Sequence, residues 1–342
     1  MSRVAVIGHF GIGLNLANGQ TIKTKIITEE LEKYCNQKAM IVDTHGGIKA
    51  IFPTIIGCIK AIKKCDNIIL MLTENGLKVS VPVLYFFNKF FHKRIHYVVI
   101  GGWLPNFLKN QALLTNELKS FYKIYVETNN MQMILEKRGF NNIVVMPNCK
   151  KLNIVSKPEK CEKPYRLCTF SRVMKEKGIE DAINAVIASN NYLGEDFYYL
   201  DIYGQIDSKQ EEWFERLKRK FPNYVNYCGL VKYDESVQVL KHYYALLFPT
   251  YYEGEGFAGT AIDAFSAGIP VLASNWKYNN EVIKDGINGK LFKPRNVEEL
   301  SNYLIDFAKN PSLLLAMRKQ CIIDAHIYEP KNVMKILLKE LI

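Results

Sequence analysis

The feature that most constrains the fold is a regular alternation of short apolar segments with longer amphipathic ones. The intervening segments, such as TKIITEELEKY and MQMILEKRGF, have apolar residues at helical spacing. The apolar runs of the first half are VAVIG, AMIVD, NIILML, HYVVIGG, KIYVE and NIVVMP. Such an alternation is typical of a parallel sheet that is covered by helices on both faces.

A polar, lysine-rich segment with two prolines, KKLNIVSKPEKCEKPYR, interrupts this alternation. The pattern then restarts with RLCTFS, FYYLDIYG, NYVNYCGLV, ALLFPT and PVLAS. Because 342 residues are too many for one ordinary core, we expect two domains. The predicted fold is α/β, with two doubly wound, Rossmann-like domains that face each other across a cleft. The expected divisions are 1–150, a linker at 151–164, 165–328, and a C-terminal helix at 329–342 that packs back on the first domain.

Several classes of protein are disfavoured by composition. No apolar stretch approaches the roughly 20 residues of a membrane span, and glycines end the first apolar run too early for a signal peptide. The eight cysteines form no CxxC, and none pairs with a histidine at metal-ligand spacing. We therefore expect a cytoplasmic protein with reduced, mostly buried cysteines and neither a disulfide framework nor a zinc site.

Positive charge is concentrated in the first half of the chain. Residues 1–150 contain 19 Lys and Arg against 9 Asp and Glu, whereas the remainder contains 26 against 25. A basic half can bind nucleic acid, an anionic membrane surface or a phosphate-bearing substrate. Nucleic acid is the least favoured of these partners, because the sequence contains no recognised nucleic-acid-binding module.

The first strand-end loop is GHFGIGLNLANGQT, which follows the apolar run VAVI. Gly11 and Gly13 allow the backbone to approach a ligand closely, and the N-terminus of the next helix favours anions, so donor binding is one interpretation. A purely structural loop that needs positive φ is an equal alternative, since the spacing is not GxGxxG. His9 is a candidate acceptor or sugar contact, and a hydrogen-bonded structural histidine is its alternative.

The second strand-end loop is SRVMKEKGIEDAI, which follows the apolar run RLCTF. Ser171, Arg172 and Lys177 lie just beyond the strand, and Gly178 opens a helix. Two cations beside a helix N-terminus can clamp a diphosphate. In isolation, a pair of basic residues is more often simply a solvated face.

The third strand-end loop, EGEGFAGTAIDA, places three carboxylates in a glycine-rich turn. A carboxylate would be repelled by a phosphate held at the backbone amides of this turn, so Glu255 and Asp263 should face neutral hydroxyls. A diphosphate flanked by hydroxyl-rich groups is a nucleotide sugar. For Asp263 the alternative is a capping box with Thr260, and for Glu253 it is exposure on the loop. The residues expected to offer the amides are Phe257, Ala258, Gly259 and Thr260.

The stretch EGEGFAGTAIDAFSAGIPVLAS, followed by KYNNEVIKDGINGKLF, resembles the signature region of the retaining glycosyltransferase family 4, whose fold is called GT-B. That family carries two glutamates separated by seven residues, and Glu255 and Asp263 match this spacing with a shorter second acid. Its Arg…Lys-Gly element is matched by Arg172 and Lys177, although Ser171 replaces the usual glycine. The resemblance covers most of the chain and is strongest from 165 to 295.

This resemblance implies a set of roles. Glu255 would bind hydroxyls of the donor sugar, Asp263 would bind the nucleotide ribose, and Arg172 with Lys177 would stabilise charge on the diphosphate leaving group. Retention by front-face attack would use a phosphate oxygen to take the acceptor proton, so no catalytic nucleophile is named. Neither a metal nor another cofactor would be required. The N-terminal half is similar to transferases that build bacterial capsular or exopolysaccharide chains, so the acceptor would be a glycan or a lipid-linked sugar.

The stretch YFFNKFFHKRIH, residues 85–96, lies in the basic half. Its aromatic residues recur at helical spacing with cations around them, which predicts a helix at an anionic bilayer on the inner face of the plasma membrane. A core-facing helix with a basic outer edge is an equal alternative. The residues concerned are Phe86, Phe87, Lys89, Phe90, Phe91, Lys93 and Arg94.

Two other functions fit the same pattern. One is a different GT-B enzyme, such as a sugar-nucleotide epimerase, which would isomerise its substrate without an acceptor. The other is a non-catalytic subunit that binds a nucleotide sugar and supports a partner. Turnover of a nucleotide sugar by the purified chain, with and without an acceptor, distinguishes both from a transferase.

Overall fold

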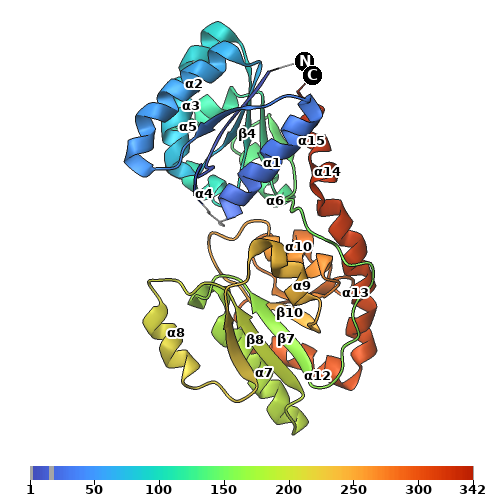
Figure 1. Cartoon of the computed structure of the whole chain (residues 1–342). Helices are drawn as coiled ribbons and strands as arrows, with labels where there is room; N and C mark the ends of the chain where they lie inside the picture. The colour runs from blue at the N-terminus through green and yellow to red at the C-terminus, as the bar shows by residue number, and fades with distance from the viewer. Residues whose placement is uncertain (1–2, 15–18, 342) are drawn as a thin grey trace. The chain divides into compact units, whose positions relative to one another are not determined.

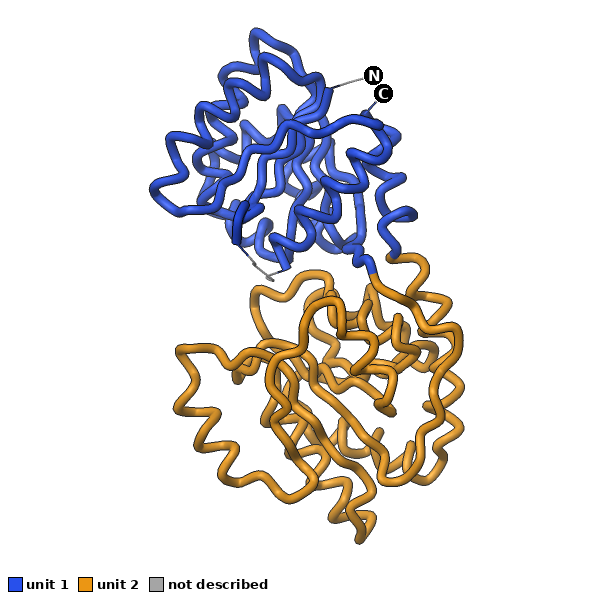
Figure 2. The backbone as a smooth tube through the Cα atoms, in the orientation of Figure 1, with its two compact units in different colours: residues 1–151, 329–342 blue, residues 152–328 orange. Residues whose placement is uncertain are grey.

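A computed structural model describes residues 3–14 and 19–341 of the chain. The chain divides into two compact units, Met1–Lys151 together with Glu329–Ile342, and Leu152–Tyr328 (Figure 2). Each unit contains one six-stranded sheet in which all neighbouring strands are parallel. The predicted α/β fold with two doubly wound domains is therefore confirmed.

The first sheet has the strand order β2-β1-β3-β4-β5-β6. The chain reverses its direction across the sheet at β1, so right-handed connections put α1 on one face and α2 on the other (Figure 1). The strands are β1 (Val4–Gly8), β2 (Met40–Asp43), β3 (Asn67–Met71), β4 (Arg94–Val98), β5 (Lys123–Val126) and β6 (Ile143–Val145). The main helices are α1 (Gly19–Cys35), α2 (Ile51–Lys64), α3 (Glu74–Phe91), α4 (Leu104–Phe107), α5 (Ala112–Lys119) and α6 (Asn129–Glu136).

The second sheet has the order β12-β11-β10-β7-β8-β9, so its direction reverses between β7 and β10. Ligands in such sheets bind beyond the carboxyl ends of the strands at this point of reversal. The strands are β7 (Tyr165–Phe170), β8 (Tyr198–Tyr203), β9 (Val225–Gly229), β10 (Ala245–Phe248), β11 (Val271–Ser274) and β12 (Gly289–Phe292). The helices are α7 (Ile179–Leu193), α8 (Glu211–Lys218), α9 (Ser236–Leu240), α10 (Gly259–Ser266), α11 (Asn279–Val282), α12 (Val297–Lys309) and α13 (Pro311–Ala325).

The central strands are buried along their whole length, as continuous apolar runs require. Every residue of β1, β3, β10 and β11 is buried. Six of the eight cysteines are also buried, which fits their use as small core side chains; Cys161 is half-buried and Cys228 is exposed. The sequence pattern did not identify β12, because its four residues, GKLF, are too short to show a period.

Two segments depart from the expected divisions. Most of the expected linker packs on the second unit: the amide of Val155 donates to the Ser266 carbonyl at 2.9 Å, and the Cys161 thiol lies 3.6 Å from the Tyr243 carbonyl. The C-terminal segment, which groups with the first unit, departs only in forming two short helices, α14 (Pro330–Val333) and α15 (Lys335–Leu338), instead of one.

The basic aromatic stretch 85–96 is not one helix, which corrects the interpretation from its spacing. Helix α3 ends at Phe91, and Arg94 already begins β4. The helix turns its Leu77, Val81 and Leu84 toward the core, which leaves Phe86 and Phe90 exposed.

Two of the cations in that stretch have partners within the protein. The Lys93 ammonium pairs with Asp66 at 3.1 Å, and the Arg94 guanidinium donates to the Glu340 carbonyl at 3.2 Å. Binding of these two cations to anionic lipid headgroups would therefore compete with their contacts inside the protein. Among the described residues, no helix combines the length and the apolar character that crossing a membrane would require.

Candidate functional site

The second unit brings two of the predicted residues together at the carboxyl ends of β7 and β10. The Lys177 ammonium lies 2.6 Å from Oε2 of Glu255, and the two side chains are only 13% and 10% exposed. Lys177 ends a short 3₁₀ helix, η3 (Lys175–Lys177), whereas Glu255 lies on the loop before α10. An ion pair so thoroughly shielded from water depends on both partners, because removal of one leaves an uncompensated charge.

Gly178 fixes the position of Lys177. Its φ is 70°, a left-handed conformation that favours glycine, and a Cβ atom there would lie 2.2 Å from the Pro249 carbonyl oxygen. The amide of Tyr251 also donates to the Glu176 carbonyl at 2.8 Å. The loops after β7 and β10 are therefore held in direct contact, and any larger residue at 178 would push them apart.

Glu255 is held by a second donor besides the lysine. The Thr250 hydroxyl, at the end of β10, donates to the same oxygen, Oε2, at 2.8 Å. The Lys177 ammonium also lies over the Tyr252 ring, 5.0 Å from its centroid. These contacts hold the carboxylate and the ammonium as one polar pair at the sheet edge.

Arg172 does not join this pair. Its guanidinium lies 3.5 Å from the Asp207 carboxylate and the side chain is 57% exposed, so it is accessible to a ligand at the end of β7. Ser171 precedes it, and its hydroxyl donates to the Arg172 carbonyl at 3.2 Å. Gly204 permits this turn, because a Cβ atom at 204 would overlap the Ser171 carbonyl.

Asp263 is almost fully buried in α10. It is 2% exposed, and its Oδ1 accepts a hydrogen bond from the Ser236 hydroxyl at 3.0 Å. The capping-box alternative is wrong, because Ala258 is the N-cap of α10 and the Thr260 hydroxyl donates to the Phe170 carbonyl at 2.7 Å instead. Asp263 and Thr260 thus tie α10 to α9 and to the end of β7.

The glycine-rich turn before α10 is tightly packed. Phe257 and Ala258 are buried, and the Phe257 ring meets that of Tyr328 edge to face at 5.1 Å. Gly259 and Thr260 form the first turn of the helix, where amides have no intrahelical acceptor. The exposed Glu253 pairs with Lys277 at 2.6 Å, so its alternative, a position on the loop surface, is the correct one.

In the first unit, a carboxylate occupies the loop after β1. The Asp43 side chain, at the end of β2, accepts from the amides of Phe10 at 3.0 Å and Ile12 at 2.9 Å. Burial raises the pKa of Asp43, but hydrogen bonds from the amides of Ile12, His45, Phe10 and Gly11 outweigh it and hold the pKa below its usual value.

Gly11 and Gly13 have φ values of 59° and 81°, as the structural-loop alternative expected. The remainder of the predicted loop, residues 15–18, lies outside the described residues.

Both ring nitrogens of His9 have partners. Nδ1 lies 2.8 Å from the Thr21 hydroxyl, and Nε2 lies 2.9 Å from Nδ1 of His45. Burial lowers the pKa of His9, and the neighbouring His45 lowers it further. His45 is exposed at the end of β2, so it, rather than His9, presents a ring edge to solvent. Sequence reasoning missed Asp43 and His45, although both directly follow an apolar run in AMIVDTH.

A buried ion pair in the first unit was also missed. The Lys23 ammonium on α1 lies 2.5 Å from Glu127, and both residues are nearly inaccessible, at 4% and 3% exposed. Glu127 also accepts from the amide of Gly101 at 3.2 Å. The pair therefore connects α1 to the ends of β4 and β5. The acid that ends the run KIYVE was its only signal in the sequence.

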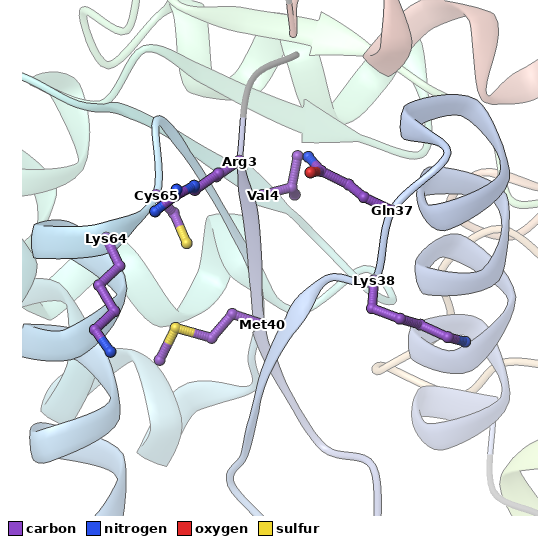
Figure 3. A pocket seen from close by; sticks show the side chains of 7 residues that line it. All are labelled: Arg3, Val4, Gln37, Lys38, Met40, Lys64 and Cys65. Carbon is purple, nitrogen blue, oxygen red and sulfur yellow. The ribbon is translucent and has the colours of Figure 1, made fainter.

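A pocket of about 480 Å³ lies at the opposite edge of the first sheet (Figure 3). It is formed where β1 and β2 begin and α2 ends, and it is lined by Arg3, Val4, Gln37, Lys38, Met40, Lys64 and Cys65. We place the candidate site at the strand carboxyl ends rather than here, because that is where ligands of doubly wound sheets bind.

The sequence segment that forms the site at the ends of β7 and β10 matches a known protein family. Residues 150–325, just over half of the chain, match the family model described as glycosyl transferases group 1. This chain belongs to the group 1 glycosyltransferases. The match contains Arg172, Lys177, Glu255 and Asp263. The expectation of a glycosyltransferase is thereby confirmed as membership of group 1, and family 4 stays a prediction.

Similar proteins extend over different parts of the chain. An uncharacterized glycosyltransferase of Methanocaldococcus jannaschii is 29% identical over 45% of this chain and 39% of its own length, so the chain spans about two fifths of that relative. An uncharacterized 41.2 kDa protein in the cps region of Klebsiella pneumoniae is 24% identical over 86% of both chains. The crystal structure of Anabaena HepE in complex with UDP and glucose has a TM-score of 0.76, at 14% identity, over 100% of this chain and 99% of that one. This group 1 member thus shares the GT-B fold.

Proposed function

We propose that this group 1 member is a retaining, family 4-type glycosyltransferase. It moves a sugar from a nucleotide diphosphate donor to a glycan or lipid-linked acceptor in the synthesis of a cell-surface polysaccharide. The observation that carries the proposal is the shielded pair of Lys177 and Glu255 at the reversal point of the second sheet. A cation and a carboxylate side by side suit a ligand with both a diphosphate and sugar hydroxyls.

The donor contacts follow from this pair. Lys177 turns from Glu255 toward the diphosphate when donor is bound, Arg172 supplies a second cation, and Glu255 accepts from sugar hydroxyls. Asp263 accepts from the ribose. The turn Phe257 to Thr260 contributes backbone amides, and Ser171, Gly11 and Gly13 allow close approach of the chain. Anabaena HepE, which was crystallised with UDP and glucose, supports a uridine diphosphate donor.

Catalysis in this proposal depends on electrostatic stabilisation of the leaving group. Negative charge grows on the diphosphate as the glycosidic bond to it breaks, and Lys177 and Arg172 offset that charge. Because two side-chain cations and helix amides do this work, the proposed reaction needs neither a metal ion nor another cofactor. The acceptor hydroxyl gives its proton to a phosphate oxygen on the same face, so the anomeric configuration is retained.

We assign the acceptor to the first unit. Its strand-end loops carry His45, and this unit holds the excess of positive charge. A role in a surface polysaccharide is supported by similarity to the cps-region protein of Klebsiella pneumoniae. We place the protein in the cytoplasm, at times on the inner face of the plasma membrane. His9 contributes by holding His45, since its own nitrogens are engaged.

A two-step experiment tests the proposal. A thermal-shift panel of nucleotides and nucleotide sugars identifies the donor as the ligand that most raises the melting temperature. The best donor is then incubated with the purified protein, EDTA, and either a glycan or a lipid-linked acceptor, and the product is examined by NMR. Transfer with retained anomeric configuration in EDTA is the expected result. An isomerised donor without transfer, or binding without any turnover, would contradict the proposal.

A further inference from the structure

The outer side of α2 carries an apolar stripe that nothing in the proposed site uses. Ile48 in the preceding 3₁₀ helix η1 (Gly47–Ala50) is 87% exposed, and Phe52 is 71% exposed. Ile51 and Ile56 add to the same segment at 40% and 36%. The inner side of the helix is apolar and fully buried: Cys58, Ala61 and Ile62 are each 0% exposed. Exposed apolar side chains that gather on one segment mark a candidate interaction surface.

The charge around this stripe has one sign. From Thr44 to Cys65 the sequence has no Asp or Glu and contains four lysines, all of them exposed: Lys49, Lys60, Lys63 and Lys64. A second copy of the chain meeting through this face would place like charges against each other across a two-fold axis. A surface that combines negative charge with apolar depth, an anionic bilayer, is the complementary partner.

The neighbouring helix, α3, carries exposed aromatic side chains of its own. Helices α2, α3 and α5 lie side by side on one face of the first sheet (Figure 1). On α3, Phe86 and Phe90 are 56% and 69% exposed, and their rings are 5.9 Å apart. Lys89 lies between them in sequence, with its ammonium over the Tyr85 ring. These aromatic side chains lie near the end of α3, beside the lysine-bearing end of α2 rather than beside Ile48 and Phe52.

The stripe also begins close to the ligand-binding edge of the first sheet. Ile48 is three residues beyond His45, whose ring contacts His9, and both follow the carboxyl end of β2. A bilayer in contact with η1 would therefore lie beside the loops that hold Asp43 and His45. An acceptor anchored in that bilayer could reach these loops without leaving the membrane.

We propose that the outer face of η1 and α2, with Ile48 and Phe52 inserted, docks on an anionic bilayer and that the acceptor is a lipid-linked saccharide presented there. Only the identity of the acceptor rests on the proposed function; the docking surface is independent of it. The lysines bind the anionic headgroups, and the apolar stripe adds a contribution that salt does not screen. The outer face of η1 and of the first turns of α2 is the leading contact.

The test uses the full chain and vesicles of phosphatidylglycerol with phosphatidylcholine, compared with phosphatidylcholine alone. In flotation, the wild-type protein should rise with the anionic vesicles only and be released incompletely by high salt. The pair Ile48→Glu and Phe52→Glu should reduce binding by at least about tenfold, since it removes two inserted side chains and adds two like charges. Tyr34→Glu is the matched control; Tyr34 is 51% exposed on α1, at the other face of the sheet, and its variant should bind as the wild type does.

Three readouts keep the outcomes separate. Circular dichroism and melting temperature check that the double variant is folded, and its affinity for a nucleotide sugar should equal that of the wild type. Transfer to a lipid-linked acceptor in vesicles should fall with membrane binding. The proposal is overturned if the wild-type protein does not float, if the double variant floats as well as the wild type, or if the stripe instead mediates a dimer that the double variant loses. Flotation without binding of any nucleotide sugar would contradict the proposed function and leave the docking surface standing.

Discussion

The Lys177 ammonium and the Glu255 carboxylate meet at 2.6 Å although 78 residues separate them in the chain. Each belongs to a loop that follows a central strand of the second sheet, and Gly178 brings the two loops together. Without a bound donor, the lysine pairs with the acid. A donor diphosphate would compete for the lysine and free the carboxylate to accept hydrogen bonds from sugar hydroxyls. The ion pair therefore keeps both groups in place and shielded from water before the donor binds.

Arg172→Ala should reduce kcat/KM without unfolding the protein. The side chain is 57% exposed and its guanidinium lies 3.5 Å from the Asp207 carboxylate, so little packing depends on it. Loss of one charge-stabilising group in the transition state costs about 2–4 kcal/mol, and kcat should carry most of the effect. Steady-state kinetics measure this, with Arg216→Ala as the control, since Arg216 is an exposed residue on α8 paired with Glu212. Equal kcat/KM values for the two variants would remove Arg172 from the proposed site.

Asp263→Asn should weaken nucleotide binding and leave the fold nearly unchanged. Asparagine keeps an acceptor for the Ser236 hydroxyl but loses the charge that a ribose hydroxyl would meet. Loss of a charged hydrogen bond costs about 1.5–3 kcal/mol, or roughly ten- to hundredfold in affinity. Calorimetric titration with the nucleotide measures this loss. Ser236→Ala is the companion variant, because it removes only the internal hydrogen bond to Asp263. If Ser236→Ala reduces nucleotide affinity as much as Asp263→Asn does, Asp263 acts by holding α9 rather than by binding the ribose.

The stability of the first unit should depend on pH through His96. Burial is the main cause that lowers the pKa of His96 to about 3, and the nearby positive charges of Arg94 and Lys123 contribute to that shift. The unfolded chain, with a pKa near 6.5, takes up the proton first, so stability is complete above that value and falls as the pH drops toward 3. Between pH 6.5 and pH 5 the loss should be on the order of 2 kcal/mol.

Urea unfolding at several pH values measures that slope. Trp103 reports on the first unit if Trp213 and Trp276, which belong to the second, are replaced by Phe. His96→Gln should flatten the dependence, because glutamine does not titrate but still offers polar atoms to Asn67 and Tyr125. A slope that survives this substitution would assign the pH dependence to other groups.

The sequence pattern predicted what depends on neighbours along the chain. Eleven of the strands appear as apolar runs, and the loops with Arg172, Lys177 and Glu255 follow them directly. Contacts between distant segments were not predictable in this way. The placement of Asp43 in the amides of the loop after β1 is one example, and the buried pair of Lys23 and Glu127 is another.

Exposure was the other property that periodicity could not predict. Helical spacing of apolar residues does not say which of them lie inward: on α2, Cys58, Ala61 and Ile62 are buried, whereas Phe52 and the preceding Ile48 are exposed. In the stretch 85–96 the helical spacing ended at Phe91, where His92 adopts a left-handed conformation and the chain turns into β4. Lys93 pairs with Asp66 and Arg94 donates to the Glu340 carbonyl, contacts that depend on tertiary packing and that the local sequence does not show.

The most direct test of the central claim is the turnover of the identified nucleotide sugar by Lys177→Met, compared with Lys175→Met. Both lysines belong to η3, but Lys175 is exposed, and its ammonium lies over the Trp213 ring, away from Glu255. If Lys177 stabilises the diphosphate leaving group, Lys177→Met should lose at least about a hundredfold in kcat. Lys175→Met should retain the wild-type rate. Wild-type turnover by a folded Lys177→Met protein would contradict the account.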